Sequence, residues 1–315
     1  MNSEPHMQHQ PPTPEIICDG LGFPEGPVAL ADGSVLLMEI EHGTVSRVSP
    51  DGRRSIVKEV GGGPNGAAIG PDGALYICNN GGMAFALVDG LKIPQGPSAD
   101  HTHGWVQRLD LDSGELTVVV ESAGGQPLIA PNDLVFDKSG GFWFTDHGSR
   151  TEHGMRFGAL CYMPSRAGGC DAIRVRDGLM SPNGVGLSPD GLTLYVADTW
   201  TGRLLSFEVA GPGRVAEPPP FHPGNIVATL PGFQLLDSLA VEADGHVCVG
   251  TLVNGGITIF SPSGDTEHVA LPDMLVTNLC FGGPDMQDVW LTCSGSGTLR
   301  KARWSRPGLP LAFGR

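Results

Sequence analysis

One phrase recurs six times along this 315-residue chain, and each copy carries a polar head residue close to its start. The head is followed by a mostly apolar run, an Asp/Gly turn and a second apolar run rich in Val, Leu, Tyr, Trp and Phe. This pattern predicts two strands joined by a hairpin. Such a unit cannot bury both of its faces alone, so successive units must pack against one another. The copies are "FPEGPVALADGSVLLMEI", "GPNGAAIGPDGALYICNN", "APNDLVFDKSGGFWFTDH", "SPNGVGLSPDGLTLYVAD", "LLDSLAVEADGHVCVGTL" and "VTNLCFGGPDMQDVWLTC".

A third strand is expected after most copies, in segments such as "WVQRLDLDSG" and "RLLSFEVAG", and a fourth in "RSIVKEV" and "LTVVVES". Units of this kind, repeated around a ring, predict an all-β fold: a six-bladed β-propeller with four-stranded antiparallel blades. Ring closure needs a strand from one terminus, and "PEIICDG" is expected to pair with the last blade near "GTLRKARW". A pair of packed β-sandwiches is the alternative, but it does not easily explain one head position recurring across the whole chain.

The propeller is expected to form a single domain over residues 15–315, after a flexible N-terminal tail over residues 1–14. The tail, "MNSEPHMQHQPPTP", lacks the basic start and apolar core of a secretory signal. No apolar run approaches the length of a membrane span. The formal net charge of -15 disfavours binding to nucleic acid and to anionic lipid. We therefore expect a soluble, cytoplasmic protein that binds neither nucleic acid nor membrane.

The cysteines carry little functional signal. There are seven, an odd number, and no C-x-x-C spacing occurs among them. Several lie in apolar strand text such as "HVCVGTL". These features are typical of buried, reduced thiols.

The head residues are the first candidates for a functional site. The innermost strand of each blade lines the central channel of a propeller, so equivalent positions at its start should meet at one mouth. Carboxylate and amide oxygens there would suit a hard divalent cation such as Ca²⁺, Mg²⁺ or Mn²⁺. For any single Asn, the alternative is a turn residue that caps its own backbone. The heads are Glu25, Asn65, Asn132, Asn183, Asp237 and Asn278.

Two long insertions are expected on the same face of the ring. Residues 81–104 and 147–158 separate the second and third strands of their blades, and that connection lies beside the start of the first strand. Long loops on a rigid scaffold commonly carry binding groups. "HTH" could form a zinc site, although solvated or hydrogen-bonded loop histidines are the ordinary alternative. The insertions would bring to the rim His101, His103, His147, Arg150, Glu152, His153 and Arg156.

"FPEGPV", "PND", "SPNGVGLSPDGLTLYVAD" and "DSLAVEADGHV" together resemble the SMP-30/gluconolactonase/luciferin-regenerating-enzyme family over about residues 15–305. The family fold is a six-bladed propeller with a divalent metal in its channel. The resemblance implies that Glu25, Asn183 and Asp237 are metal ligands and that Asp237 is also the general base. It implies that Asn132 contacts either the metal or the substrate. Family members include sugar lactonases, other lactonases and enzymes that hydrolyse organophosphates.

One position departs from the family pattern. Sugar-lactone members with a basic substrate contact carry Arg two residues before the third head, where this chain has Ala130. The missing guanidinium weakens the case for a polyhydroxylated sugar lactone and favours a less polar lactone. Arg150 or Arg156 from the rim could compensate, which would restore the sugar-lactone interpretation.

The leading hypothesis is a lactone hydrolase that depends on one divalent ion, Ca²⁺, Mn²⁺, Mg²⁺ or Zn²⁺, and acts on a small lactone or ester. The ion would polarise the ring carbonyl, and Asp237 would accept a proton from the attacking water. Other residues expected to bind substrate are Asn132, Asn65, His147, Arg150 and Glu152. The alternatives are a phosphotriesterase or arylesterase on the same metal site and a non-catalytic ligand-binding propeller. No Gly-x-Ser-x-Gly motif or phosphate-binding Gly-rich loop supports serine-hydrolase or nucleotide chemistry.

Overall fold

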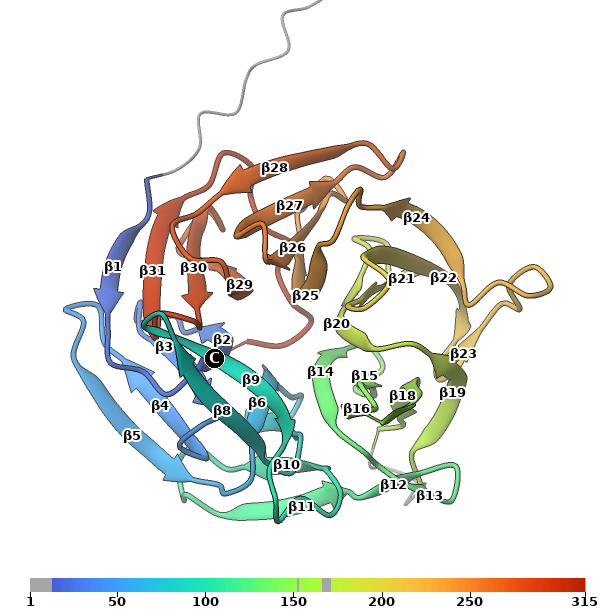
Figure 1. The fold of residues 1–315 in the computed structure, drawn as a ribbon, viewed down its shortest axis with the longest axis horizontal. Helices are drawn as coiled ribbons and strands as arrows, with labels where there is room; N and C mark the ends of the chain where they lie inside the picture. Colours follow the sequence, from blue (N-terminus) through green and yellow to red (C-terminus); the bar gives the residue numbers. More distant parts are fainter. Residues whose placement is uncertain (1–12, 152, 166–170, 315) are drawn as a thin grey trace, which may run out of the picture.

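The computed structural model describes residues 13–151, 153–165 and 171–314. Within them, six antiparallel sheets follow one another around a central axis, as a β-propeller (Figure 1). The expected six-bladed, all-β fold is therefore confirmed. The N-terminal tail expected over residues 1–14 lies almost wholly outside the described residues. No helix in the described part of the chain is long and apolar enough to cross a membrane.

The first three blades each contain four strands, which follow one another from the channel outward. Blade 1 comprises β2 (Pro24–Ala29), β3 (Val35–Glu39), β4 (Thr44–Val48) and β5 (Arg54–Glu59). Blade 2 comprises β6 (Pro64–Ile69), β7 (Leu75–Asn79), β10 (Trp105–Leu109) and β11 (Leu116–Val120). Blade 3 comprises β14 (Pro131–Phe136), β15 (Phe142–Asp146), β18 (Gly158–Met163) and β19 (Ile173–Leu179).

The remaining blades complete the ring. Blade 4 comprises β20 (Pro182–Leu187), β21 (Thr193–Asp198), β22 (Arg203–Gly211) and β24 (Asn225–Thr229), and the short β23 (Arg214–Val215) also pairs with β22. Blade 5 comprises β25 (Leu235–Val241), β26 (Val247–Leu252), β27 (Gly256–Phe260) and β28 (Thr266–Ala270). Blade 6 comprises β29 (Val276–Gly282), β30 (Asp288–Cys293), β31 (Thr298–Arg303) and β1 (Glu15–Cys18).

Both ends of the chain contribute to closing the ring. Strand β1 pairs antiparallel with β31, with Glu15 opposite Lys301 and Ile16 opposite Arg300. This confirms the pairing expected for "PEIICDG". Because the first and last strands share one blade, the sheet formed from the end of the chain cannot separate from blade 1 without breaking this pairing.

The core lies between neighbouring blades, where apolar side chains of adjacent sheets interdigitate. Between blades 2 and 3, the ring of Tyr76 meets that of Phe136 edge-on, with the ring centroids 5.0 Å apart. Within blade 3, Trp143 and Tyr162 pack with their ring centroids 4.8 Å apart and are buried. The inner strands are therefore buried on both faces, which explains why their text is apolar after the head residue.

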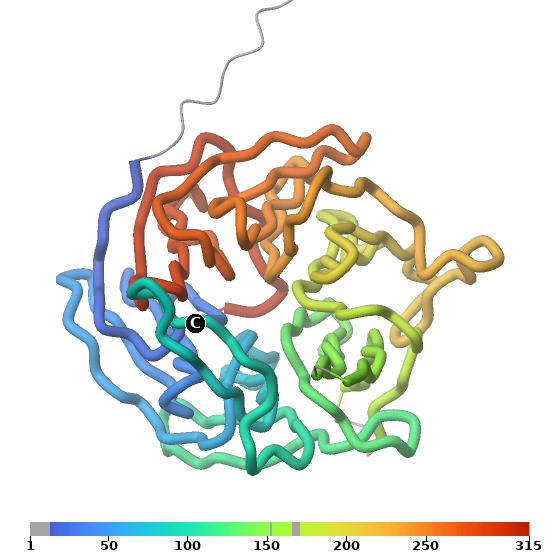
Figure 2. Tube along the Cα trace, viewed as in Figure 1, coloured from blue at the N-terminus to red at the C-terminus, as the bar shows by residue number. Residues whose placement is uncertain are grey.

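We call the side of the ring where the inner strands begin the head face, and the opposite side the turn face. Residues 305–314 cross the turn face near the centre of the ring (Figure 2). Leu309 N donates a hydrogen bond to Val241 O in blade 5 at 2.8 Å. Phe313 then packs edge-on against Phe136 in blade 3, with a centroid distance of 5.8 Å. The end of the chain thus covers the channel on the turn face.

The two insertions form hairpins on the head face, where the sequence predicted long loops. Residues 81–104 contain β8 (Met83–Val88) and β9 (Leu91–Pro97), and residues 147–158 contain β16 (Ser149–Thr151) and β17 (Gly154–Arg156). A third small hairpin, β12 (Ser122–Ala123) with β13 (Gln126–Pro127), connects blades 2 and 3.

The described cysteines are unpaired, and the predicted burial holds for most of them. Cys280 is half-buried, and Cys170 lies outside the described residues. Burial raises the pKa of Cys280 and of Cys293 to about 12, which keeps both thiols protonated and unreactive at neutral pH. The buried ones are Cys18, Cys78, Cys161, Cys248 and Cys293.

Candidate metal and substrate site at the channel mouth

Every inner strand is irregular at its head residue. In β2 the pairing with β3 shifts register between Glu25 and Val28, and the other five inner strands shift at the equivalent place. A bulge bends a strand and re-aims the side chain that it carries. The head side chains are all buried, between 2% and 8% exposed: Glu25, Asn65, Asn132, Asn183, Asp237 and Asn278.

Glycines that follow three of the heads allow neighbouring inner strands to approach closely. A Cβ added to Gly184 would lie 2.5 Å from Leu239 N in blade 5. A Cβ added to Gly66 would lie 2.4 Å from Asp133 Oδ1 in blade 3. Gly26 has a φ of 48° and equally close contact with the main chain of Asn65. Only glycine fits these positions, which explains the recurring P-x-G at the heads.

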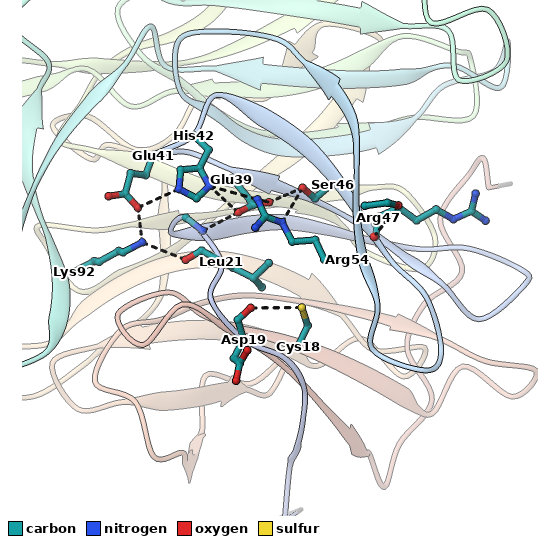
Figure 3. A network of polar contacts seen from close by, with 12 residues as sticks. Cys18, Asp19, Leu21, Glu39, Glu41, His42, Ser46, Arg47, Arg54 and Lys92 are labelled. Atoms are coloured by element: carbon teal, nitrogen blue, oxygen red, sulfur yellow. Dashed lines mark hydrogen bonds and ion pairs between the residues drawn. The ribbon is translucent and has the colours of Figure 1, made fainter.

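A second set of buried polar residues holds the main chain just ahead of the heads. Gly22 N donates to Glu39 Oε2 at 2.7 Å, and Ala130 N donates to Asp146 Oδ1 at 2.7 Å. Glu39 also pairs with Arg54 at 2.6 Å, as Figure 3 shows. These contacts fix where each inner strand enters the channel. Each of these residues is the last one of the second strand in its blade. In blades 1 to 4 they are Glu39, Asn79, Asp146 and Asp198.

The two acidic heads are buried and electrostatically coupled. Glu25 Oε2 accepts hydrogen bonds from Gly26 N and from Asn278 Nδ2, both at 2.8 Å. Burial raises the pKa of Glu25. Burial and the nearby charge of Glu25 raise the pKa of Asp237 well above its usual value, although the Asn183 amide bonds to the Asp237 carboxyl. Glu25, Asn183 and Asp237 are therefore neighbours around one axis.

A third buried acid, Asp133, lies beside them and was not among the residues predicted from the sequence. Its Oδ1 accepts from Leu134 N at 2.8 Å, and its Oδ2 accepts from Val185 N of blade 4 at 3.3 Å. Burial, with a smaller contribution from Glu25, raises the pKa of Asp133 to about 7. The available signal was a charged residue inside the apolar strand text "PNDLVF".

The mouth is suited to a divalent cation. The side-chain oxygens Asn65 Oδ1 and Asn132 Oδ1 are buried and have no hydrogen-bond partner in the described structure. No basic side chain is among the groups that shift the pKa of Glu25, Asp133 or Asp237 within the described residues. Unpartnered amide oxygens beside uncompensated carboxyls are the donors that a hard cation prefers. The residues present therefore fit a metal ion.

A second acidic cluster, Glu242 with Asp244 and His246, lies at the hairpin turn of blade 5 on the turn face. Its carboxylates already have partners. Glu242 accepts from Trp304 Nε1 at 2.6 Å and forms an ion pair with Arg306. Asp244 accepts from His246 Nδ1 at 2.9 Å. With these partners, the cluster has a structural explanation that needs no ion.

The rim of the mouth carries His147 and Arg150. His147 is half-buried, and burial lowers its pKa against the opposing effect of Asp198 and Asp146. The guanidinium of Arg150 lies over the ring of Trp200, 4.1 Å from its centroid. Because Trp200 follows the second strand of blade 4, this contact links the insertion of blade 3 to the next blade on the head face.

The other predicted rim residues are less directly connected with the heads. His101 Nε2 lies 2.9 Å from Asn80 O and 3.1 Å from Ile129 O, so this ring is engaged with main-chain carbonyls. His103 packs edge-on against Trp105 at a centroid distance of 5.6 Å. His153 and Arg156 are exposed, and Glu152 lies outside the described residues.

The chain is similar to proteins of known activity. It is 27% identical over 300 residues to a gluconolactonase from Zymomonas mobilis subsp. mobilis, covering 85% of this chain and 75% of that one. It is 26% identical over 252 residues to lactonase drp35 from Staphylococcus saprophyticus, covering 79% and 69%. Regucalcin, a calcium-binding protein from Agrobacterium tumefaciens, has a similar fold, with a TM-score of 0.70 and 18% identity over 96% and 98% of the two chains.

A family model described as the SMP-30/gluconolactonase/LRE-like region matches residues 23–295. This range contains every head residue and the inner strand of every blade. The resemblance carried by the motifs is therefore confirmed across the ring. The chain belongs to the SMP-30/gluconolactonase/LRE-like family.

Proposed function

We propose that the protein is a lactone hydrolase that depends on a divalent metal ion at the channel mouth. The observation that carries the proposal is the pair of buried acidic heads, Glu25 and Asp237, which have no basic side chain among the described groups that shift their pKa values. The unpartnered amide oxygens Asn65 Oδ1 and Asn132 Oδ1 leave acceptors open for a substrate or the ion. Two relatives named gluconolactonase and lactonase support the reaction class. The calcium-binding neighbour of similar fold supports a divalent ion.

Glu25, Asn183 and Asp237 would hold the ion, with Asn132 as a further ligand or substrate contact. When bound, a divalent ion supplies Lewis-acid polarisation of the lactone carbonyl. The acidic heads offset the ionic charge, and the amides add ligands without adding repulsion. Asn278 and Gly26 hold the Glu25 carboxyl by hydrogen bonds at 2.8 Å, which limits its movement before the ion binds.

Asp237 would act as the general base. A carboxylate oxygen of Asp237 accepts a proton from water while the water oxygen attacks the carbonyl carbon of the lactone. The ring C–O bond then breaks, and the proton passes from Asp237 to the departing ring oxygen, which leaves a hydroxy acid. In the ion-free chain, burial and the charge of Glu25 raise the pKa of Asp237. A divalent ion nearby would offset both effects and favour the charged carboxylate, which is the form that accepts a proton.

Asn65, Asn132 and the rim residues His147 and Arg150 would orient the substrate. His147 is half-buried and kept neutral by burial, so it can donate or accept a hydrogen bond at the mouth. Arg150 is fixed over Trp200 and presents a cation at the rim.

The test is a turnover assay with chelated and metal-reloaded protein on γ- and δ-lactones, aryl esters and a phosphotriester. Lactone hydrolysis should disappear on chelation and return with Ca²⁺, Mn²⁺, Mg²⁺ or Zn²⁺ to different degrees. Asp237→Asn should lower kcat at least about 100-fold with the fold intact, whereas Asp51→Asn, at an exposed turn, should not. Full activity in the chelated protein would refute the metal-dependent mechanism. If the protein hydrolysed only the aryl esters or the phosphotriester, it would belong to a different class of hydrolase.

A further inference from the structure

The β8–β9 hairpin from blade 2 reaches across the head face to blades 1 and 6. Figure 1 shows it arching over the inner strands on the near side. At its tip, Lys92 N donates to Gly295 O in blade 6 at 2.9 Å. The Lys92 ammonium donates to Leu21 O at 3.3 Å and forms an ion pair with Glu41, contacts drawn in Figure 3. Main-chain and side-chain contacts thus anchor the hairpin over the ring.

Apolar side chains of the hairpin and of the ring beneath it pack into one cluster. Phe85 packs on Phe23 with the ring centroids 4.8 Å apart. Phe23 lies two residues before the acidic head Glu25, and Leu275 lies three residues before Asn278, so the cluster begins beside the heads. We call it the hairpin wall; its members are Phe23, Ile40, Met83, Phe85, Ile93, Leu252 and Leu275.

Part of the apolar area of the hairpin wall stays exposed, next to the polar head residues. Phe23, Ile40 and Leu275 are buried, whereas Phe85 and Met83 are only half-buried. Because the wall spans the starts of blades 6 and 1 and the end of β26 in blade 5, it borders the mouth rather than the outer edge of the ring.

Among the described residues, no basic side chain shifts the pKa of Glu25, Asp133 or Asp237, so no cation lies close to the heads on the side opposite the wall. Ala130, two residues before the third head, offers only a methyl group, and its main-chain N–H is occupied by Asp146 at 2.7 Å. Arg150, the alternative cation, is exposed at the rim and stacks on Trp200. A polyhydroxylated ring would therefore find no cation beside the heads and would meet apolar side chains at the wall.

We infer that the site takes lactones whose ring carries an apolar alkyl or aryl substituent, seated against the hairpin wall. This inference rests on the proposed function. The lactone carbonyl would lie at the head residues, and the substituent would cover Phe85 and Met83. Sugar hydroxyls placed against these side chains would lose their water partners without replacement, which disfavours a sugar lactone.

The test measures kcat/KM of the metal-loaded full chain for γ-butyrolactone, γ-hexalactone, γ-octalactone, γ-decalactone and glucono-δ-lactone. Each methylene buried on the wall should raise kcat/KM, by up to about fourfold, until the wall is covered. Glucono-δ-lactone should be the poorest substrate of the series. Because the comparison uses the unmodified chain, it does not depend on any variant folding.

Two variants locate the effect in the hairpin. Phe85→Ala should lower the ratio of kcat/KM for γ-decalactone to that for γ-butyrolactone by about tenfold, because the aromatic part of the wall is removed. Leu87→Ala changes a side chain on the same strand that is 73% exposed and not in the wall, so it should leave the ratio unchanged.

The outcomes separate the inference from the proposed function. Equal kcat/KM along the alkyl series, preference for glucono-δ-lactone, or an unchanged ratio in Phe85→Ala would each overturn the substrate class while lactone hydrolysis stands. If the metal-loaded protein hydrolyses none of these lactones, the proposed function itself fails.

Discussion

The side-chain amide of Asn278 in β29 donates a hydrogen bond to Glu25 Oε2 in β2 at 2.8 Å and so joins the last inner strand to the first. Asn278 Oδ1 accepts from Leu279 N at 2.7 Å, which fixes the orientation of the amide. Its nitrogen therefore faces the acidic head, and its oxygen faces its own backbone. Although Asn278 occupies a head position, its contacts assign it to holding Glu25 rather than to binding an ion.

Asn278→Ala should weaken divalent metal binding about 10- to 100-fold, because Glu25 loses a partner that orients it. Calorimetric titration of chelated protein with Mn²⁺ or Ca²⁺ measures this without any substrate. Asn225→Ala, on the exposed outer strand β24, is the matched control and should leave the affinity unchanged. Equal affinities for the two variants would show that the Asn278 contact does not support the ion site.

The repeat in the sequence was enough to predict the fold and to place the heads together. Each head begins an inner strand, and the period of the repeat puts these strands around one axis. The different roles of the heads could not be predicted in this way. Asn65 and Asn278 both occupy a head position, yet Asn65 Oδ1 has no hydrogen-bond partner whereas Asn278 Oδ1 accepts from Leu279 N. The nitrogen of the Asn278 amide is held by Glu25, 253 residues away in sequence, and the local sequence does not reveal that contact.

Two features were missed although local signals existed. Asp133 follows a head directly, and its role depends on Val185 N in the next blade, a tertiary contact that sequence spacing does not reveal. The β8–β9 hairpin was expected as a loop, although Asp89 and Gly90 form its tip with φ values of 50° and 83°. An Asp-Gly pair between apolar runs is a strong hairpin signal. The unusual length of the insertion concealed it.

The metal-free protein should lose stability as the pH rises from about 4 to about 7. Burial raises the pKa of Asp133 from 3.8 to about 7, so in this range the native state keeps a proton that the unfolded chain has released. Each pH unit therefore lowers the free energy of unfolding by about 1.4 kcal/mol for such a group. The raised pKa values of Glu25 and Asp237 act in the same direction.

Urea denaturation of chelated protein at several pH values measures this dependence. Asp133→Asn should reduce the decline without abolishing it, because the other two acids remain. Saturating divalent ion should remove most of the decline, since it favours the charged carboxylates. A chelated protein that is equally stable at pH 4 and pH 7 would contradict the electrostatic description of the mouth.

Gly184→Ala should impair the metal site through geometry alone. The added Cβ would lie 2.5 Å from Leu239 N, which must move the inner strands of blades 4 and 5 apart. Asn183 and Asp237 are carried by these strands, so divalent metal affinity should fall by about tenfold or more. Gly154→Ala is the matched control, because nothing lies within 4 Å of its added Cβ. Unchanged metal affinity in Gly184→Ala would mean that the two strands do not position the ligands.

Gly308→Ala should destabilise the ring from the turn face. A Cβ at Gly308 would lie 2.1 Å from Cγ of Phe281, so either the chain end or blade 6 must shift. Overpacking of this kind costs about 1–3 kcal/mol, which urea denaturation of the metal-loaded protein would detect. Gly314→Ala adds the same methyl group where nothing lies within 4 Å and should change the stability by less than about 0.5 kcal/mol. Because residues 305–314 contact blade 5 through Leu309 and blade 3 through Phe313, an equal stability of the two variants would mean that the chain end lies on the ring without holding it closed.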